Sequence, residues 1–180
     1  MNQWNYFFGA IMLDSDYKGF LDFLQNRMKT KDYYYFHPDI FSTSTLEIPY
    51  CYENALISFG RTAKWFLQYE YDLHHFIREF EDILNHLDFE YAQVRAGTVY
   101  SEYSFFWMNK KKLEKYKTRI QETEDHFKEY NIRFYENEHF FFGLGDIELS
   151  TGWCERKNDD AEDFDIQYPD FKYPVEQINR

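Results

Sequence analysis

The residues best suited to chemistry share one face of a predicted helix. His75, Glu79, Asp82 and His86 follow one another at intervals of four, three and four residues, which places all four on the same side of an α-helix. Two imidazoles and two carboxylates are acceptable ligands for a divalent metal. His75 and His86 lie about 16 Å apart along such a helix, so they cannot share one ion. Only His75 and Glu79 could serve a small metal-dependent enzyme together, with further ligands coming from elsewhere.

The chain contains no motif of an established catalytic centre. It has no His-Glu-x-x-His, no Gly-x-Ser-x-Gly and no phosphate-binding Gly-x-x-x-x-Gly-Lys. Gly143 and Gly145 lack the third glycine and the following helix of a dinucleotide site, so a turn explains them better. We therefore interpret the polar helix face as a solvated surface, and we expect a protein that is not an enzyme and uses no metal or cofactor.

Charge and composition indicate the class of partner. The 180 residues carry 20 Lys and Arg against 32 Asp and Glu, a net charge of −12, and 23% of them are aromatic. Disordered acidic chains contain few aromatics, so this chain is expected to fold. A strongly acidic surface repels phosphate, which disfavours direct binding of nucleic acid. Carboxylates and aromatic rings together suit the binding of a basic protein, although the charge could also serve solubility alone.

Hydrophobic periodicity predicts an α+β domain over residues 1–154. We expect helices at 17–28, 72–87 and 111–130, and strands at 4–13, 33–36, 55–66, 89–107 (two strands that reverse near 96–98 or near 101), 132–142 and 147–153. Single helices between strand runs favour a mainly antiparallel sheet with about three helices packed on one face. The first six elements follow the order of a split β-α-β unit, as in ferredoxin-like domains.

The C-terminal segment, residues 155–180, differs in character from the rest. Acids accumulate between positions 159 and 170, and Phe164, Tyr168, Phe171 and Tyr173 are interspersed among them. The segment is either a mobile tail or an extended segment laid over the domain. Four aromatics left in water would be unusual for a solvating tail, so we expect the segment to pack on the domain.

Targeting signals and cysteines indicate the compartment. No Lys or Arg precedes the apolar run of residues 1–13, so no signal peptide is predicted. No apolar run approaches the ~20 residues of a membrane-spanning helix. Cys51 and Cys154 fit two reduced thiols better than a disulfide, which remains the alternative. The sequence thus predicts a soluble cytoplasmic protein without membrane contact.

Four segments carry a resemblance to a known group of proteins. They are residues 57–66 (ISFGRTAKWF), 72–87, 89–94 (FEYAQV) and 103–110 (YSFFWMNK). In their mixture of aromatics and acidic helices they resemble the small α+β immunity proteins encoded beside bacterial polymorphic or contact-dependent toxins. The resemblance covers about the middle third of the chain. It implies a non-enzymatic, tight-binding inhibitor of a cognate toxin, often a nuclease.

We therefore expect the chain to bind and inhibit a basic effector such as a toxin nuclease. The candidate contact residues are acids and aromatics of the helix at 72–87 and of the C-terminal segment: Glu79, Glu81, Asp82, Asp160, Asp163, Phe164 and Tyr168. Three alternatives stay open. The chain could be a phage-encoded inhibitor of a CRISPR or other defence nuclease, a metal-dependent enzyme using His75 and Glu79, or a structural subunit of a larger assembly.

Overall fold

The computed structural model describes residues 5–14, 17–42, 55–98, 101–114, 119–155 and 158–174. Its strands are β1 (Asn5–Leu13), β2 (Ala55–Ala63), β3 (Phe89–Gly97), β4 (Glu102–Asn109), β5 (Phe134–Glu136), β6 (Phe140–Leu144), β7 (Asp146–Glu148) and β8 (Trp153–Glu155). Its α-helices are α1 (Tyr17–Asp22), α2 (Glu70–Leu84), α3 (Lys110–Leu113), α4 (Arg119–Glu129) and α5 (Asn158–Gln167). A π-helical turn, η1 (Phe23–Met28), continues α1, and a 3₁₀ turn, η2 (Pro38–Ile40), follows it.

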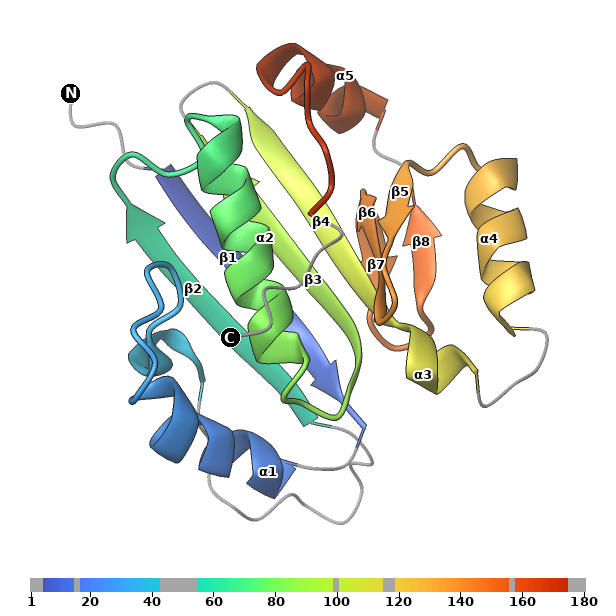
Figure 1. Cartoon of the computed structure of the whole chain (residues 1–180). Coiled ribbons are helices and arrows are strands. Elements are labelled where there is room, and N and C mark those ends of the chain that lie inside the picture. Colours follow the sequence, from blue (N-terminus) through green and yellow to red (C-terminus); the bar gives the residue numbers. More distant parts are fainter. Residues whose placement is uncertain are drawn as a thin grey trace.

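The strands form one large antiparallel sheet and one small one. Six strands pair in the order β2-β1-β3-β4-β6-β5, and β7 pairs separately with β8. Every pair of neighbours is antiparallel. In Figure 1, α2 runs across the large sheet, while α4 and the small sheet lie at its far end. The predicted α+β class with a mainly antiparallel sheet is confirmed.

Helix α2 is the best predicted element because its apolar residues recur with the helical period. Leu73, Phe76, Ile77 and Phe80 are fully buried along one side, as a continuous stripe requires. The helix begins after Tyr69, where the Asp72 carboxylate accepts the Tyr69 backbone N–H at 3.2 Å. Such a bond satisfies one of the amide groups near the helix start. The bounds differ from the expected 72–87 by two or three residues at each end.

Two hydrophobic cores lie on opposite faces of the sheet because successive side chains of a strand point to opposite sides. In β4, Phe105 and Trp107 join the core beneath α1, α2 and α5, whereas Phe106 and Met108 join a second core. The second core contains Phe127 of α4 together with side chains of β7 and β8. We call these sides the α2 face and the α4 face. Three helices, α1, α2 and α5, thus pack on one face, as predicted for about three helices, whereas α4, from the predicted helix at 111–130, lies on the other.

The strand expected at residues 33–36 is absent from the described structure, where this segment is irregular. The predicted β-α-β-β-α-β order of the first part is therefore not formed. Instead β2, α2 and β3 make a split β-α-β unit. Its two strands are parallel to each other and separated by β1, which pairs with both. Tyr33, Tyr35 and Phe36 pack into the core without joining a sheet, whereas Tyr34 between them is exposed.

The C-terminal half of the sheet is divided differently from the prediction. The expected hairpin of 132–142 with 147–153 is replaced by two pairs, β5 with β6 and β7 with β8. The chain leaves β6 through Gly145, whose φ of 136° favours glycine. The predicted helix at 111–130 is split into α3 and α4. The reversal between β3 and β4 is closed by a bond from Thr98 N–H to the Ser101 carbonyl at 2.7 Å.

The C-terminal segment lies on the domain through α5 and the residues that follow it. Phe164, Tyr168 and Tyr173 are buried in the core of the α2 face, and the Tyr168 hydroxyl donates to the Leu67 carbonyl at 2.7 Å. None of the helices in the described ranges is long and apolar enough to cross a bilayer. Cys154 is a buried free thiol. Its possible partner Cys51, like the rest of 43–54, lies outside the described residues.

Candidate functional site

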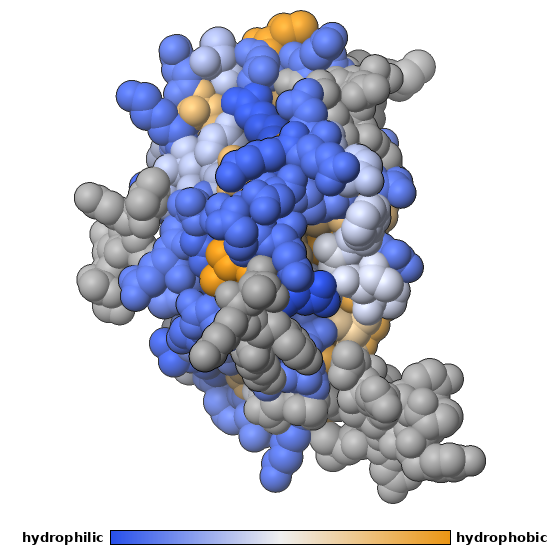
Figure 2. All heavy atoms as spheres, turned by 90° about the vertical axis from the view of Figure 1, so that its right-hand side faces the viewer, coloured by the Kyte–Doolittle hydropathy of each residue, from blue (hydrophilic) through white to orange (hydrophobic). Residues whose placement is uncertain are grey.

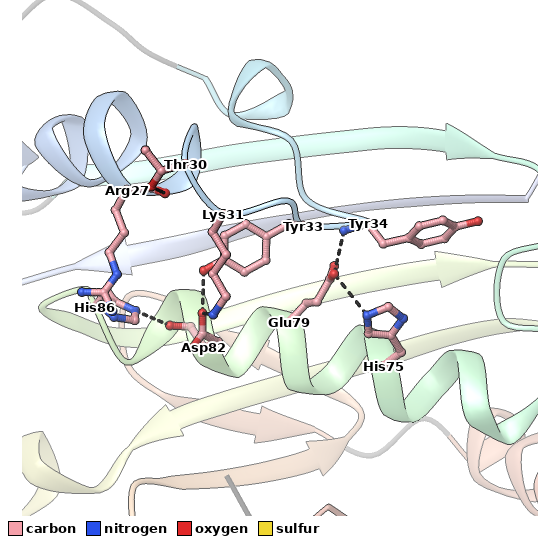
Figure 3. Close-up of polar contacts among 9 residues, drawn as sticks. All are labelled: Arg27, Thr30, Lys31, Tyr33, Tyr34, His75, Glu79, Asp82 and His86. Atoms are coloured by element: carbon pink, nitrogen blue, oxygen red, sulfur yellow. Dashed lines mark hydrogen bonds and ion pairs between the residues drawn. The ribbon is translucent and has the colours of Figure 1, made fainter. Parts of the chain in front are cut away.

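The polar face of α2 is covered by the irregular segment that precedes β2. Figure 3 shows residues 27–34 lying along this face. The Glu79 carboxylate accepts the backbone N–H groups of Tyr34 at 2.6 Å and of Tyr35 at 2.8 Å. The His75 Nε2 atom lies 3.3 Å from a Glu79 oxygen. Glu79 thus replaces the strand neighbour that residues 33–36 lack, because it satisfies amides that would otherwise be unpaired.

Asp82, one turn further along α2, forms hydrogen bonds with the same segment. Its carboxylate accepts bonds from Lys31 Nζ and from the Tyr33 hydroxyl, each at 2.5 Å. The Asp82 backbone carbonyl bonds with Nδ1 of His86 at 2.6 Å. Partial burial acts to raise the pKa of Asp82, but the hydrogen bonds from Lys31 and Tyr33 outweigh it, and the pKa lies below its ordinary value. This face is therefore an internal contact, and the prediction that it is solvated is wrong for Glu79.

The metal-binding alternative gains no further ligands. Both Glu79 oxygens already accept backbone N–H groups. Among the residues that the structure describes, no group of three or more His, Cys, Asp or Glu side chains could hold a metal ion. His75 instead lies beside the Glu79 carboxylate that supports the neighbouring segment.

Glu81 is a buried carboxyl group on the opposite side of α2. It is 3% exposed and accepts bonds from Trp107 Nε1 at 3.1 Å, from Asn137 Nδ2 at 3.3 Å and from the Tyr173 hydroxyl. Burial raises the pKa of Glu81 to about 7, against the opposing effect of these three donors. The network joins α2, β4, the β5–β6 turn and the C-terminal segment. Its position predicts a structural role.

The structure separates the predicted contact residues into buried and exposed groups. Glu79, Glu81, Phe164 and Tyr168 are buried, so the prediction that they contact a partner is wrong for this arrangement of the chain. Asp163 is exposed on α5, and Asp82 is half-buried against Lys31 and Tyr33. Asp160 belongs to α5, but its side chain lies outside the described part of the structure.

The loop between β2 and α2 has an unusual backbone. Trp65 has a φ of 56° and Leu67 a φ of 55°, in the left-handed region that favours glycine over large side chains. The two residues of left-handed conformation flank Phe66. As a result Phe66 and Leu67 point into the core with no exposed surface, while Trp65 points outward. A strained conformation of this kind persists only where the surroundings hold it, and it is common at functional sites.

Four contacts hold this loop, three of them from distant parts of the chain and one from the start of α2. Asn5 Nδ2 donates to the Phe66 carbonyl, and the Tyr168 hydroxyl donates to the Leu67 carbonyl. Gln167 Nε2 donates to the Gln68 carbonyl at 3.2 Å, and Asp72 accepts the Gln68 N–H. The loop is therefore fixed by β1, α2 and α5 together. This makes it a rigid platform.

The most exposed aromatic residues near α2 lie on this loop, at the start of α2 and on the segment beside it. Trp65 is 74% exposed, Tyr69 71%, Tyr71 74% and, on the neighbouring segment, Tyr34 67%. The His75 ring lies 5.9 Å from the ring of Tyr34 and 6.1 Å from that of Tyr71. We call Tyr34, Trp65, Tyr69 and Tyr71 the aromatic surface. Exposed aromatic groups on a rigid element are typical of contact sites.

Acidic residues of α5 lie beside the aromatic surface. Gln167 contacts the loop at Gln68, and Asp163 precedes Gln167 by one helical turn, on the same side of α5. Glu162 and Asp165 are also exposed on α5, but Asp165 lies on another side of the helix, where it pairs with Arg133. Asp163 is thus a predicted contact residue that is exposed on the side of α5 carrying Gln167, the residue that contacts the loop.

Sequence reasoning missed the aromatic surface. One signal was available for its tyrosines, because Tyr69 and Tyr71 fall outside the apolar stripe of α2 and are therefore free to face water. Trp65 belongs to an aromatic run that continues β2 in pattern, so its exposure depends on the two left-handed residues. The chain shows no significant match to any protein-family model, curated protein or solved structure. The functional argument therefore rests on the site itself.

Proposed function

We propose that this protein is a non-enzymatic inhibitor that binds a basic effector, such as a toxin nuclease, through the aromatic surface and the neighbouring acids of α5. The observation that carries the proposal is the exposure of four aromatic side chains beside a strained loop that three other elements hold in place. A monomeric domain rarely leaves so much aromatic area in water without a use. The net charge of −12 favours a basic partner.

In this proposal the aromatic rings supply the binding energy and the carboxylates raise the rate of association. Tyr and Trp bury large areas with few rotatable bonds, and they dominate binding energy at interfaces. A loop that is already ordered loses little conformational entropy on binding. Carboxylates such as Asp163 and Glu162 add long-range attraction that raises the association rate with a basic partner. Occlusion of a substrate site by such a surface would inhibit a nuclease without any catalytic residue.

The test is capture of a partner from a lysate of the source cells at low salt, followed by affinity measurement. We expect the wild-type protein to retain one basic protein and release it only at high salt. Trp65→Ala and Tyr69→Ala should each weaken that complex at least about thirtyfold, as anchor residues do. Leu56→Ala is the matched control, because Leu56 is also exposed but lies on β2, with its side chain on the opposite side of the sheet from α2.

Two results would contradict the proposal. The first is a complex whose affinity is unchanged in both aromatic variants. The second is an effector that is acidic or whose binding does not respond to salt. The gene neighbourhood then distinguishes the kinds of inhibitor, since an adjacent toxin gene supports an antitoxin and a phage genome supports an inhibitor of a defence nuclease.

A further inference from the structure

A second group of exposed rings lies on the α4 face, on the other side of the sheet from α2. The ring of His126 in α4 lies 4.1 Å from that of Trp153 in β8 and 4.6 Å from that of Tyr130 at the end of α4. The Tyr130 and Trp153 rings are 5.8 Å apart. Trp153 is 49% exposed and Tyr130 50%. His126, Tyr130 and Trp153 thus form a continuous aromatic cluster that is open on one side.

The surrounding backbone holds this cluster in place. His126 Nε2 lies 3.0 Å from the Cys154 carbonyl, and because that oxygen can only accept, the nitrogen carries the hydrogen. Helix α4 ends at Glu129, and the chain turns at Asn131, a left-handed residue with a φ of 52°. The small sheet that carries Trp153 is tied to the large one by an ion pair from Arg95 to Asp146 at 2.9 Å. The rings are therefore ordered before any partner arrives.

Carboxylates surround the cluster. Figure 2 shows that the side of the molecule carrying α4 is predominantly hydrophilic, with few separate hydrophobic spots. The exposed acids of α4, β7 and β8 are Glu122, Asp125, Glu129, Glu148 and Glu155. Within the described ranges, no side chain pairs with Glu122, Glu129 or Glu155, whereas Lys128 pairs with Glu124 at 3.8 Å. We call the ring cluster together with these five acids the acidic-aromatic surface.

We propose that the acidic-aromatic surface binds an arginine-bearing segment of a protein partner. The charge favours a cation, and the rings select among cations. A guanidinium group stacks on the face of Trp or Tyr while its N–H groups donate to nearby carboxylates. A lysine ammonium group satisfies the carboxylates but stacks less well on a ring. Acidic segments and nucleic acid are disfavoured by the same carboxylates.

This inference does not depend on the proposed function. The two surfaces use different elements, with Trp65 and Tyr69 next to α2 on one side and Trp153 and Tyr130 next to α4 on the other. If both are occupied by one basic effector, the protein holds it by two contacts, and each raises the effective concentration for the other.

The experiment titrates the full chain with three synthetic peptides of equal length, in which Gly alternates with Arg, Lys or Glu, and follows binding by calorimetry. We expect the arginine peptide to bind more tightly than the lysine peptide and the glutamate peptide not to bind. The double variant Trp153→Ala/Tyr130→Ala should weaken arginine-peptide binding about tenfold. Phe8→Ala, which removes a ring of β1 that is exposed to a similar extent (48%) and belongs to neither proposed surface, should leave it within about twofold of the wild-type value.

Each of the following results would overturn the inference. In the first, the double variant binds the arginine peptide as the wild type does, so that attraction is general and the rings are not used. In the second, the lysine peptide binds as well as the arginine peptide. In the third, ultracentrifugation finds a dimer that Trp153→Ala dissociates, which would assign the surface to a second copy of the chain. Because synthetic peptides replace the effector, failure here leaves the capture experiment with Trp65 variants unaffected.

Discussion

The pH dependence of stability provides the most direct test of the buried Glu81 network. Burial raises the pKa of Glu81 from its ordinary 4.5 to about 7, although Tyr173, Trp107 and Asn137 donate hydrogen bonds that oppose the rise. The folded pKa therefore lies above the unfolded one, and the folded protein holds this proton more tightly. The resulting stabilisation is fully present below the unfolded pKa and is lost as the pH rises through the folded pKa.

The size of the effect follows from the two pKa values. Their difference is about 2.5, and one pKa unit corresponds to about 1.4 kcal/mol, so the contribution that disappears between pH 4.5 and 7 is on the order of 3 kcal/mol. Glu81→Gln removes the titrating group. The new side-chain N–H would face another donor, Asn137 Nδ2, which lies 3.3 Å from the carboxylate of the wild type. This variant is therefore expected to be less stable than the wild type at low pH. The diagnostic quantity is the slope with pH.

The assay is urea unfolding followed by tryptophan fluorescence at several pH values from about 4.5 to 7.5, with linear extrapolation to water. Subtracting the Glu81→Gln curve from the wild-type curve removes the titration of other groups. The difference should fall by about 3 kcal/mol as the pH rises. Glu162→Gln, an exposed change on α5, should keep the wild-type slope. Parallel wild-type and Glu81→Gln curves across this range would refute the reasoning.

Three further variants test the packing of the sheet and the support of the irregular segment. Gly143→Ala is expected to lower the free energy of unfolding by about 2 kcal/mol, because a Cβ there would lie 2.1 Å from Cζ of the buried Phe106 ring; a thermal melt equal to that of the wild type would contradict this. Glu79→Ala should lower the free energy of unfolding by about 3 kcal/mol and open residues 33–36 to chymotrypsin, because Tyr34 and Tyr35 lose their N–H acceptor. Asp82→Ala should lower the free energy of unfolding by only about 1 kcal/mol, because Lys31 and Tyr33 can form hydrogen bonds with water instead. An equal loss of unfolding free energy in Glu79→Ala and Asp82→Ala would argue against a special role of Glu79.

Local patterns predicted those elements whose surroundings agree with their own periodicity. The stripe of α2 and strand β4 bury the residues that the pattern marks as apolar, while β1 and β2 bury alternate ones and leave Phe8 and Leu56 exposed. Residues 33–36 have the composition of a strand, but their amides bond to a carboxylate of α2 instead of a neighbouring strand. That partner is 44 residues away along the chain, so no local pattern reveals it.

The candidate site was predicted only in part, for a related reason. Asp163 is exposed, as a contact residue must be, while the basic partner stays a prediction from net charge. Glu81, however, follows Ile77 by four residues and precedes Leu84 by three, so it belongs to the apolar stripe. That spacing predicts a buried carboxyl group. It is the sequence signal from which the burial of Glu81, and its unsuitability as a contact residue, could have been predicted. Phe164 and Tyr168 are buried because α5 packs on the sheet, as the expectation that the aromatic-containing segment packs on the domain already implied.

The position of β1 between β2 and β3 has a consequence for how the chain acquires its fold. Leu13 pairs with Ala55 on one side and with Phe89 on the other. The first strand therefore cannot pair until β2 and β3, which are synthesised much later, are available. Pairings of such long sequence separation carry a large loop-closure cost and slow the rate of folding. On the ribosome, β1 gains its second neighbour only after β3 has emerged. Until then its buried face, with Phe7 and Ile11, is a segment that chaperones would protect from aggregation.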